Sequence, residues 1–178
     1  MAITGPFVHA LHAGIAEQFP DDAPDILYRA GYEQGLQDLL RVSRELREAY
    51  GAAFDFWQAD PKFVLETWWA PLAQAGWGRA RFDLGAFARQ LVVVEITDGL
   101  IPAALGHTAQ PMCHHTAGAL AGALGFFERA ERHATEIACV ADGAAHCTFV
   151  VAPGPVVDSA EAARQEGLAP ADILLRLR

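Results

Sequence analysis

Three cysteines and one glutamate in the second half of the chain combine residue types and spacing that suit a metal ion. Glu136, Cys139 and Cys147 form the pattern E-x2-C-x7-C, and Cys113 is the one other cysteine of the chain. Three thiolates and a carboxylate make a sulfur-rich set of four ligands, which fits tetrahedral zinc better than magnesium or calcium. Since this set leaves no open coordination position, it predicts a structural Zn²⁺ rather than a catalytic one.

A predicted β-hairpin explains how two of these ligands meet. Residues 132–140 and 146–151 have the composition of strands, and they are separated by Asp142-Gly143. The hairpin would place two cysteines opposite one another with Cβ atoms roughly 4.5–5.5 Å apart, so that both sulfurs could bind one zinc. Residues three apart in a regular strand face opposite sides. We therefore expect a bulge or a strand end between Glu136 and Cys139.

Cys113 lies at the expected N-terminus of a helix over residues 114–127, just after the chain break at Pro111. Backbone amides and the helix dipole favour a thiolate there. The spacing alone leaves two other interpretations open. The three cysteines could be buried without a metal, or Cys139 and Cys147 could form a disulfide, and the glutamate would then merely be solvated.

Three histidines lie next to cysteines, and histidine is a common zinc ligand. On a strand, His146 points away from Cys147, which favours a surface position. For His114 and His115 the sequence leaves open a place beside the metal, a place in a pocket, and an ordinary core or surface position.

Length and charge limit the classes of partner. The 178 residues are enough for one well-buried domain, so we expect a single domain over residues 1–178. A formal net charge of -9 and a single lysine, Lys62, argue against binding to nucleic acid or anionic membranes. We expect no membrane span, because no run of about eighteen apolar residues occurs. An odd cysteine count and no recognisable signal peptide indicate a cytoplasmic protein.

Three parts follow one another along the chain. Apolar periodicity predicts helices across residues 5–75. Residues 76–152 contain two further predicted strands, at 79–84 and 91–96, followed by the small-residue helix and the hairpin. The tail, 153–178, predicts one or two short helices. Together these elements predict an α+β fold.

A stripe of glycines marks the predicted helix over 114–127. Gly118, Gly122 and Gly125 lie along it, so another element must pack very close. The sequence leaves open whether that element is a ligand or dimer partner, or a part of the protein's own core.

Several short motifs resemble the vinyl-4-reductase domain family. They cover about residues 25–151, and the cysteine and glutamate positions are the most specific part. The motifs are Leu27-Tyr28-Arg29-Ala30-Gly31-Tyr32-Glu33-Gln34-Gly35, Gly76-Trp77-Gly78, Pro111-Met112-Cys113-His114-His115 with Gly118 and Gly122, Glu136-x2-Cys139, and Gly143 with Cys147-Thr148-Phe149-Val150.

The resemblance implies a fold similar to subunits of the TRAPP vesicle-tethering complex. Such a fold has a twisted antiparallel sheet of about four strands with helices packed on one face, and its subunits associate in pairs, which implies a homodimer. The same domain is the input module of phenol-responsive transcriptional activators. There the corresponding three cysteines and glutamate bind zinc beside a pocket for an aromatic ligand, which favours zinc at Cys113, Glu136, Cys139 and Cys147.

A ligand pocket is the second implied site, although aromatic residues at such spacing also fill ordinary cores. Ala123 and Ala134 stand where the phenol sensors carry tyrosines, and the histidine and tryptophan that hold the phenolic hydroxyl are not found here. A cavity lined in this way would suit a ligand larger or less polar than phenol. The candidate pocket residues are Trp68, Trp69, Phe82, His115, Ala123, Phe127 and Ala134.

These features predict a zinc-stabilised module that senses or carries a hydrophobic or aromatic small molecule and acts through a downstream protein partner. An enzyme is less favoured, because no dinucleotide fingerprint and no arrangement for a nucleophile is recognisable. Two alternatives stay open. One is an accessory enzyme or substrate carrier in the vinyl reduction of a bacteriochlorophyll-type tetrapyrrole, and the other is a dimeric assembly subunit.

Overall fold

The computed structural model describes residues 4–108 and 112–178, so Pro111 lies outside the described residues. The helices are α1 (Gly5–Gln18), α2 (Ala23–Tyr50), α3 (Pro61–Gln74), α4 (Leu100–Leu105), α5 (His114–Glu128), α6 (Gly154–Gln165) and α7 (Pro170–Leu177). The strands are β1 (Arg79–Asp83), β2 (Val92–Thr97), β3 (His133–Ala138) and β4 (Cys147–Ala152).

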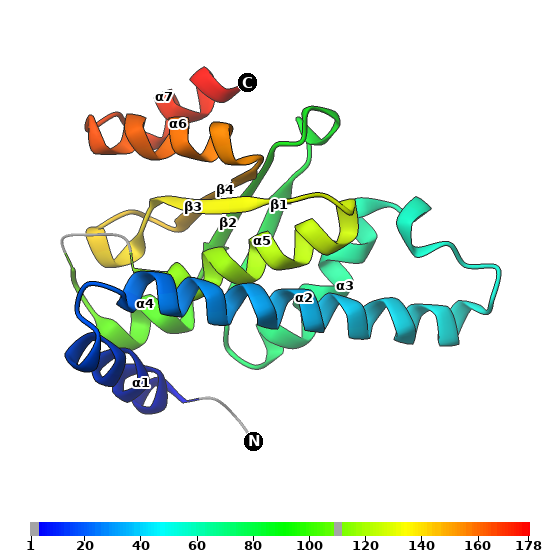
Figure 1. The fold of residues 1–178 in the computed structure, drawn as a ribbon, viewed down its shortest axis with the longest axis horizontal. Coiled ribbons are helices and arrows are strands. Elements are labelled where there is room, and N and C mark those ends of the chain that lie inside the picture. The colour runs from blue at the N-terminus through cyan, green and yellow to red at the C-terminus, as the bar shows by residue number, and fades with distance from the viewer. Residues whose placement is uncertain (1–3, 109–111) are drawn as a thin grey trace.

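The four strands form one antiparallel sheet in the order β1-β2-β4-β3. The central pair joins the chain-distant strands β2 and β4, in which Val94 lies opposite Phe149. Strands β1 and β3 are the two edges. The expected α+β fold with an antiparallel sheet of four strands is confirmed (Figure 1).

Each face of the sheet packs against its own helices, because side chains alternate along a strand. On one face Val94 and Phe149 are buried in a core that includes Leu120 of α5. On the other face Val150 is buried against Ile173 of α7 and against residues of α6. The C-terminal helices therefore extend the expected arrangement by covering part of the second face (Figure 1).

Helix α5 lies between the sheet and the long helix α2 (Figure 1). Its residues from Thr116 to Gly125 are all buried, as expected for a helix that is apolar on every side. The glycine stripe contacts α2, since a Cβ atom at Gly118 or Gly122 would lie about 2 Å from a backbone oxygen of that helix. Gly31 and Gly35 of α2 make the reciprocal approach to α5. The element packed on the stripe is therefore a core helix of the same chain.

The turn after α3 follows the sequence prediction closely. Asp60 begins the helix by accepting hydrogen bonds from the backbone amides of Lys62 and Phe63. Gly76, expected in a left-handed conformation after the helix, has φ +93°. The indole nitrogen of Trp69 donates to the Gly78 carbonyl at 2.9 Å, which ties α3 to the start of β1.

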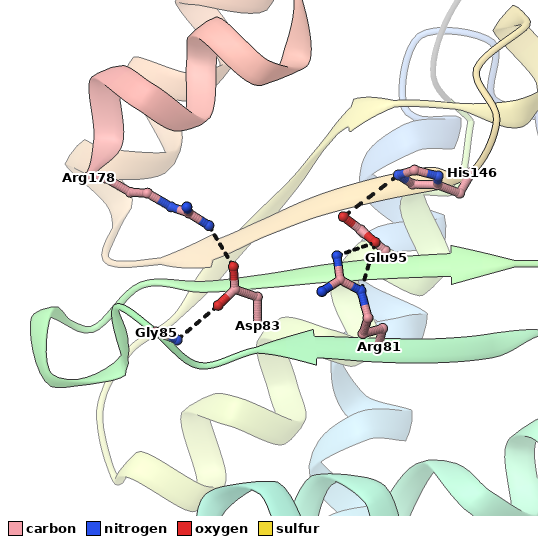
Figure 2. A network of polar contacts seen from close by, with 6 residues as sticks. All are labelled: Arg81, Asp83, Gly85, Glu95, His146 and Arg178. Carbon is pink, nitrogen blue, oxygen red and sulfur yellow. Dashed lines mark hydrogen bonds and ion pairs between the residues drawn. The ribbon is translucent and has the colours of Figure 1, made fainter.

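Polar contacts fill the part of the sheet surface that α6 and α7 leave uncovered. Figure 2 shows Arg81 of β1 donating two hydrogen bonds to Glu95 of β2, with His146 3.7 Å away from the same carboxylate. Arg178, at the end of α7, pairs with Asp83 at 2.5 Å (Figure 2). This surface ties the C-terminal helix to β1. Among the described residues, every helix is too short or too polar to cross a membrane.

Candidate metal centre and the adjoining cleft

The four residues singled out by their spacing come together in the structure. Cys113, Glu136, Cys139 and Cys147 are all buried, and their ligand atoms lie within 4.8 Å of one another. The Cys147 sulfur is 3.9 Å from the sulfurs of both other cysteines. Tetrahedral ligation with Zn–S bonds of 2.3 Å separates sulfurs by roughly 3.8 Å, so this spacing fits a shared zinc. All three cysteines are free, and the disulfide interpretation is therefore wrong.

Three elements bring these ligands together. Cys113 is the residue before α5, Cys147 begins β4, and Cys139 follows β3 directly. The pairing of β3 with β4 shifts its register between Glu136 and Ala138. This shift is the irregularity expected from the sequence, and it lets two residues three positions apart reach the same site.

Glu136 bridges the sheet and the start of α5. Its Oε2 accepts hydrogen bonds from the backbone amides of Met112 and Cys113, each at 3.1 Å. Its Oε1 is buried and has no hydrogen-bond partner among the described residues. A buried carboxylate oxygen beside three thiols is the kind of unsatisfied acceptor that a cation satisfies. The residues present therefore fit a zinc ion.

The four groups cannot all ionise without a cation. Burial and the nearby Cys139 raise the pKa of Glu136 to about 7. Hydrogen bonds from Cys113 and Cys147 lower the pKa of Cys139, whereas donating to Cys139 raises the pKa of Cys113. In the metal-free protein, one thiolate is thus stabilised by its neighbours while other ligands keep their protons. A divalent cation would remove that conflict.

The three histidines beside the cysteines lie outside the four-ligand cluster. His115 stacks on Trp77 with ring centroids 5.3 Å apart, and burial lowers its pKa to about 4. His146 is half-exposed on the sheet surface near Glu95, as expected. His114 faces away from the stack and lines a cleft beside the cluster.

This cleft has a volume of about 690 Å³ and runs along the free edge of β3. Its walls come from the N-terminal parts of α2 and α5, from β3 and from α6. Glu136 belongs to both the cleft wall and the candidate metal cluster. The lining residues are Pro24, Asp25, Tyr28, His114, Ala117, His133, Ala134, Thr135, Glu136, Val157, Asp158, Glu161, Arg164 and Gln165.

The contribution of α6 to this cleft was missed by sequence reasoning. Asp158, Glu161 and Arg164 recur at intervals of three, which places polar side chains on one side of a helix, and this signal was available.

The seven residues predicted to line a pocket do not gather around one space. Trp68, Trp69, Ala123 and Phe127 are buried in the core on the α5 side of the sheet. Phe82 is half-buried, with its ring centroid 6.4 Å from that of Trp69. Of the seven, Ala134 lines the large cleft. A second crevice, beside Trp77 and Cys113, has a volume of only about 10 Å³, enough for about one water molecule.

Comparison with known families confirms the resemblance inferred from the motifs. Residues 92–153 match the family model of the vinyl-4-reductase (4VR) domain. The matched segment runs from the start of β2 to the residue before α6, and it contains all four residues of the metal cluster. No curated protein sequence matches the chain.

Three solved structures resemble this chain. The phenol-responsive sensory domain of the transcription activator PoxR, crystallised with phenol, aligns with a TM-score of 0.66 and 16% identity over 86% of this chain and 76% of that one. A trafficking protein particle complex subunit 3 from Naegleria fowleri, covalently bound to palmitic acid, gives 0.56 and 11% over 83% and 93%. A vinyl-4-reductase family protein from Methanocaldococcus jannaschii gives 0.49 and 18% over 70% and 66%. The first two similarities establish a shared fold.

Proposed function

We propose that this chain is a metal-stabilised module that binds a small hydrophobic or aromatic molecule and acts as a sensor or carrier. The observation that carries the proposal is a 690 Å³ cleft with a candidate metal ligand, Glu136, in its wall. Its volume lies within the range of roughly 300–1,000 Å³ typical of ligand sites. The match to the vinyl-4-reductase domain and the fold shared with a phenol-sensing domain support the same class of function.

The metal in this proposal is a structural zinc held by Cys113, Glu136, Cys139 and Cys147. Bound zinc would supply folding free energy by cross-linking the start of α5 to the end of the hairpin. The backbone amides of Met112 and Cys113 already hold Glu136 in place. Fixing Glu136 and the first turn of α5 in this way also fixes one wall of the cleft.

The ligand would lie against an apolar surface formed by Tyr28, Ala117, Ala134 and Val157. Two of these side chains are methyl groups, which leaves room for a ring beside β3. The Tyr28 hydroxyl accepts a hydrogen bond from the backbone amide of Ala134 at 3.1 Å, so the tyrosine ring is held at the cleft rather than free to rotate. The carboxylates of α6 stand beside this surface and would keep polar ligand groups in water.

Native mass spectrometry of freshly purified protein tests both parts of the proposal, because it reports metal and co-purified ligand together. We expect about one zinc per chain. A panel of phenol, alkylphenols and larger arenes should raise the midpoint of thermal unfolding for at least one member. Replacing Ala134→Trp would fill the cleft and abolish that rise, whereas Ala162→Trp on exposed α6 would not. Binding that persists in Ala134→Trp would place the ligand elsewhere.

A homodimer is the second proposal, and α1 supports it. Phe7, Leu11 and Phe19 are 52%, 45% and 48% exposed, and their spacing of four and eight residues puts them on one side of the helix. Exposed apolar surfaces of this kind mark association sites. Leu11→Glu should yield monomers in analytical ultracentrifugation, while Ala13→Glu, on another side of α1, should not. A wild-type chain that stays monomeric at high concentration would refute the dimer.

A further inference from the structure

The cleft beside the metal cluster exposes the backbone of an unpaired strand edge. Strand β3 is the last strand of the sheet and pairs with β4 alone. The Ala134 amide donates to the Tyr28 hydroxyl, so it points away from β4. Because backbone groups alternate in direction along a strand, the N–H and C=O groups of Glu136 face the same way.

This edge is recessed rather than covered. In the described part of the chain, no backbone hydrogen bond joins residues 133–136 to any segment other than β4. Helix α2 and helix α6 stand on either side of the edge, with Pro24 and Val157 among the lining residues. A recessed edge avoids uncontrolled pairing with other sheets while leaving room for one narrow chain.

The charge of the cleft favours a basic occupant. Asp25, Asp158 and Glu161 line it, and Arg164 is the single arginine or lysine among its lining residues. The Nε atom of Arg164 is buried and has no hydrogen-bond partner within the described residues. It is therefore available to donate to a carbonyl group of an added chain, while the carboxylates attract lysine or arginine side chains.

We propose that the free edge of β3 accepts an extended, basic peptide segment of a partner protein as a fifth strand of the sheet. About four residues, or roughly 13 Å of extended chain, would lie along residues 133–136. This goes beyond small-molecule binding, because it assigns a surface to a protein partner. Since both occupants would fill the same cleft, a bound small molecule excludes the peptide, and the cleft can convert ligand binding into release of a partner.

Selection from a displayed library of random eight-residue peptides tests the proposal on the full chain. We expect enrichment of sequences in which lysine or arginine alternates with other residues. Two synthetic copies of an enriched peptide would then carry N-methyl groups on alternate backbone nitrogens, in the two possible registers. Only one register of an added strand faces β3, so one copy should lose roughly tenfold in affinity and the other should bind normally. Equal behaviour of both copies, or no enrichment, would overturn the proposal.

Charge-reversal variants identify the surface used. Glu161→Lys and Asp158→Lys should each weaken the peptide roughly fivefold or more, whereas Glu33→Lys, on exposed α2 outside the cleft, makes the same change in net charge and should not. Amide hydrogen exchange at Ala134 and Glu136 should slow when the peptide binds. Exchange that slows elsewhere instead would also overturn the assignment. These measurements need no small molecule, so a failure of small-molecule binding would leave their outcome unchanged.

Discussion

Gly118 of α5 approaches α2 so closely that a Cβ atom at this position would lie 1.9 Å from the carbonyl oxygen of Tyr28. The Tyr28 side chain in turn accepts a hydrogen bond from the Ala134 amide, so the distance between the two helices also sets where Tyr28 stands in the cleft. The backbone of α2 cannot yield cheaply, because the reciprocal glycines Gly31 and Gly35 hold it against α5.

Gly118→Ala should therefore lower the free energy of unfolding by about 3 kcal/mol, as overpacking of rigid backbone does. Gly14→Ala is the matched control, because Gly14 lies within helix α1 and has nothing within 4 Å of its added Cβ. That control should stabilise the protein by roughly 0.5–1 kcal/mol through helix propensity. Urea denaturation measures both. Equal effects of the two substitutions would contradict the close helix contact.

Removing the metal should destabilise the whole fold. Chelation should lower the midpoint of thermal unfolding by on the order of 10 °C, because structural zinc contributes folding free energy directly. Cys139→Ser should unfold near the chelated wild type and should not respond to chelator. Purified protein with three titratable thiols and no metal would exclude the site. A fold that survives chelation while ligand binding alone disappears would instead assign the metal a functional role.

Zinc binding should release protons. The raised pKa values of Cys113 and Glu136 mean that these groups hold protons at neutral pH in the metal-free protein, and a cation must displace them. The apparent zinc affinity should therefore fall as the pH falls from 8 toward 6, with about one such pH unit changing it severalfold or more. Titration calorimetry in two buffers of different ionisation enthalpy measures the protons released. Identical heats in both buffers would refute this.

Stability should depend on His115 in acid. Burial, with a smaller contribution from His12, lowers the pKa of His115 to about 4, below its ordinary value of 6.5. The folded state thus disfavours protonation, so this stabilisation is complete above pH 6.5 and is lost as the pH falls toward 4. His115→Gln should flatten the dependence in that window. Both proteins are compared with excess zinc present, and parallel curves would show that His115 contributes nothing.

The pair of Arg132 and Glu128 should matter far more than pairs on the sheet surface. Their side chains are 4% and 11% exposed, whereas those of Arg79 and Asp98 are 78% and 72% exposed. Glu128→Gln leaves a buried guanidinium without its counter-ion and should cost about 3 kcal/mol. Asp98→Asn should cost less than about 1 kcal/mol. Chemical denaturation of both variants measures the difference, and similar costs would contradict the burial.

The metal site could be predicted because short-range rules fix most of it. The hairpin turn, the start of α5 and the alternation of β3 depend on neighbouring residues, and together they required an irregularity between Glu136 and Cys139. The helix contact was only half predictable. The stripe containing Gly118 announced a close partner, but Gly35 lies far away in sequence within a charged helix, where nothing distinguishes a packing glycine from a weak one.

The cleft escaped prediction for a related reason. Aromatic residues such as Trp68 and Phe127 predict burial correctly, yet spacing cannot show whether neighbouring side chains leave space between them, and here they fill it. The space lies instead between Tyr28 and α6, two parts of the chain that meet only because the sheet separates them. Such a gap depends on the packing of whole elements, which no local pattern encodes.

The 34 positions between Cys113 and Cys147 give the candidate metal site a mechanical meaning. A zinc held at both ends would close this stretch, including α5 and β3, into a ring. If the chain ends were pulled apart, the segments outside the ring would extend first. The ring would keep roughly 120 Å of contour length in reserve until the metal left. Zinc would then act as a force-bearing clasp, and its dissociation would be the last step in extending the chain.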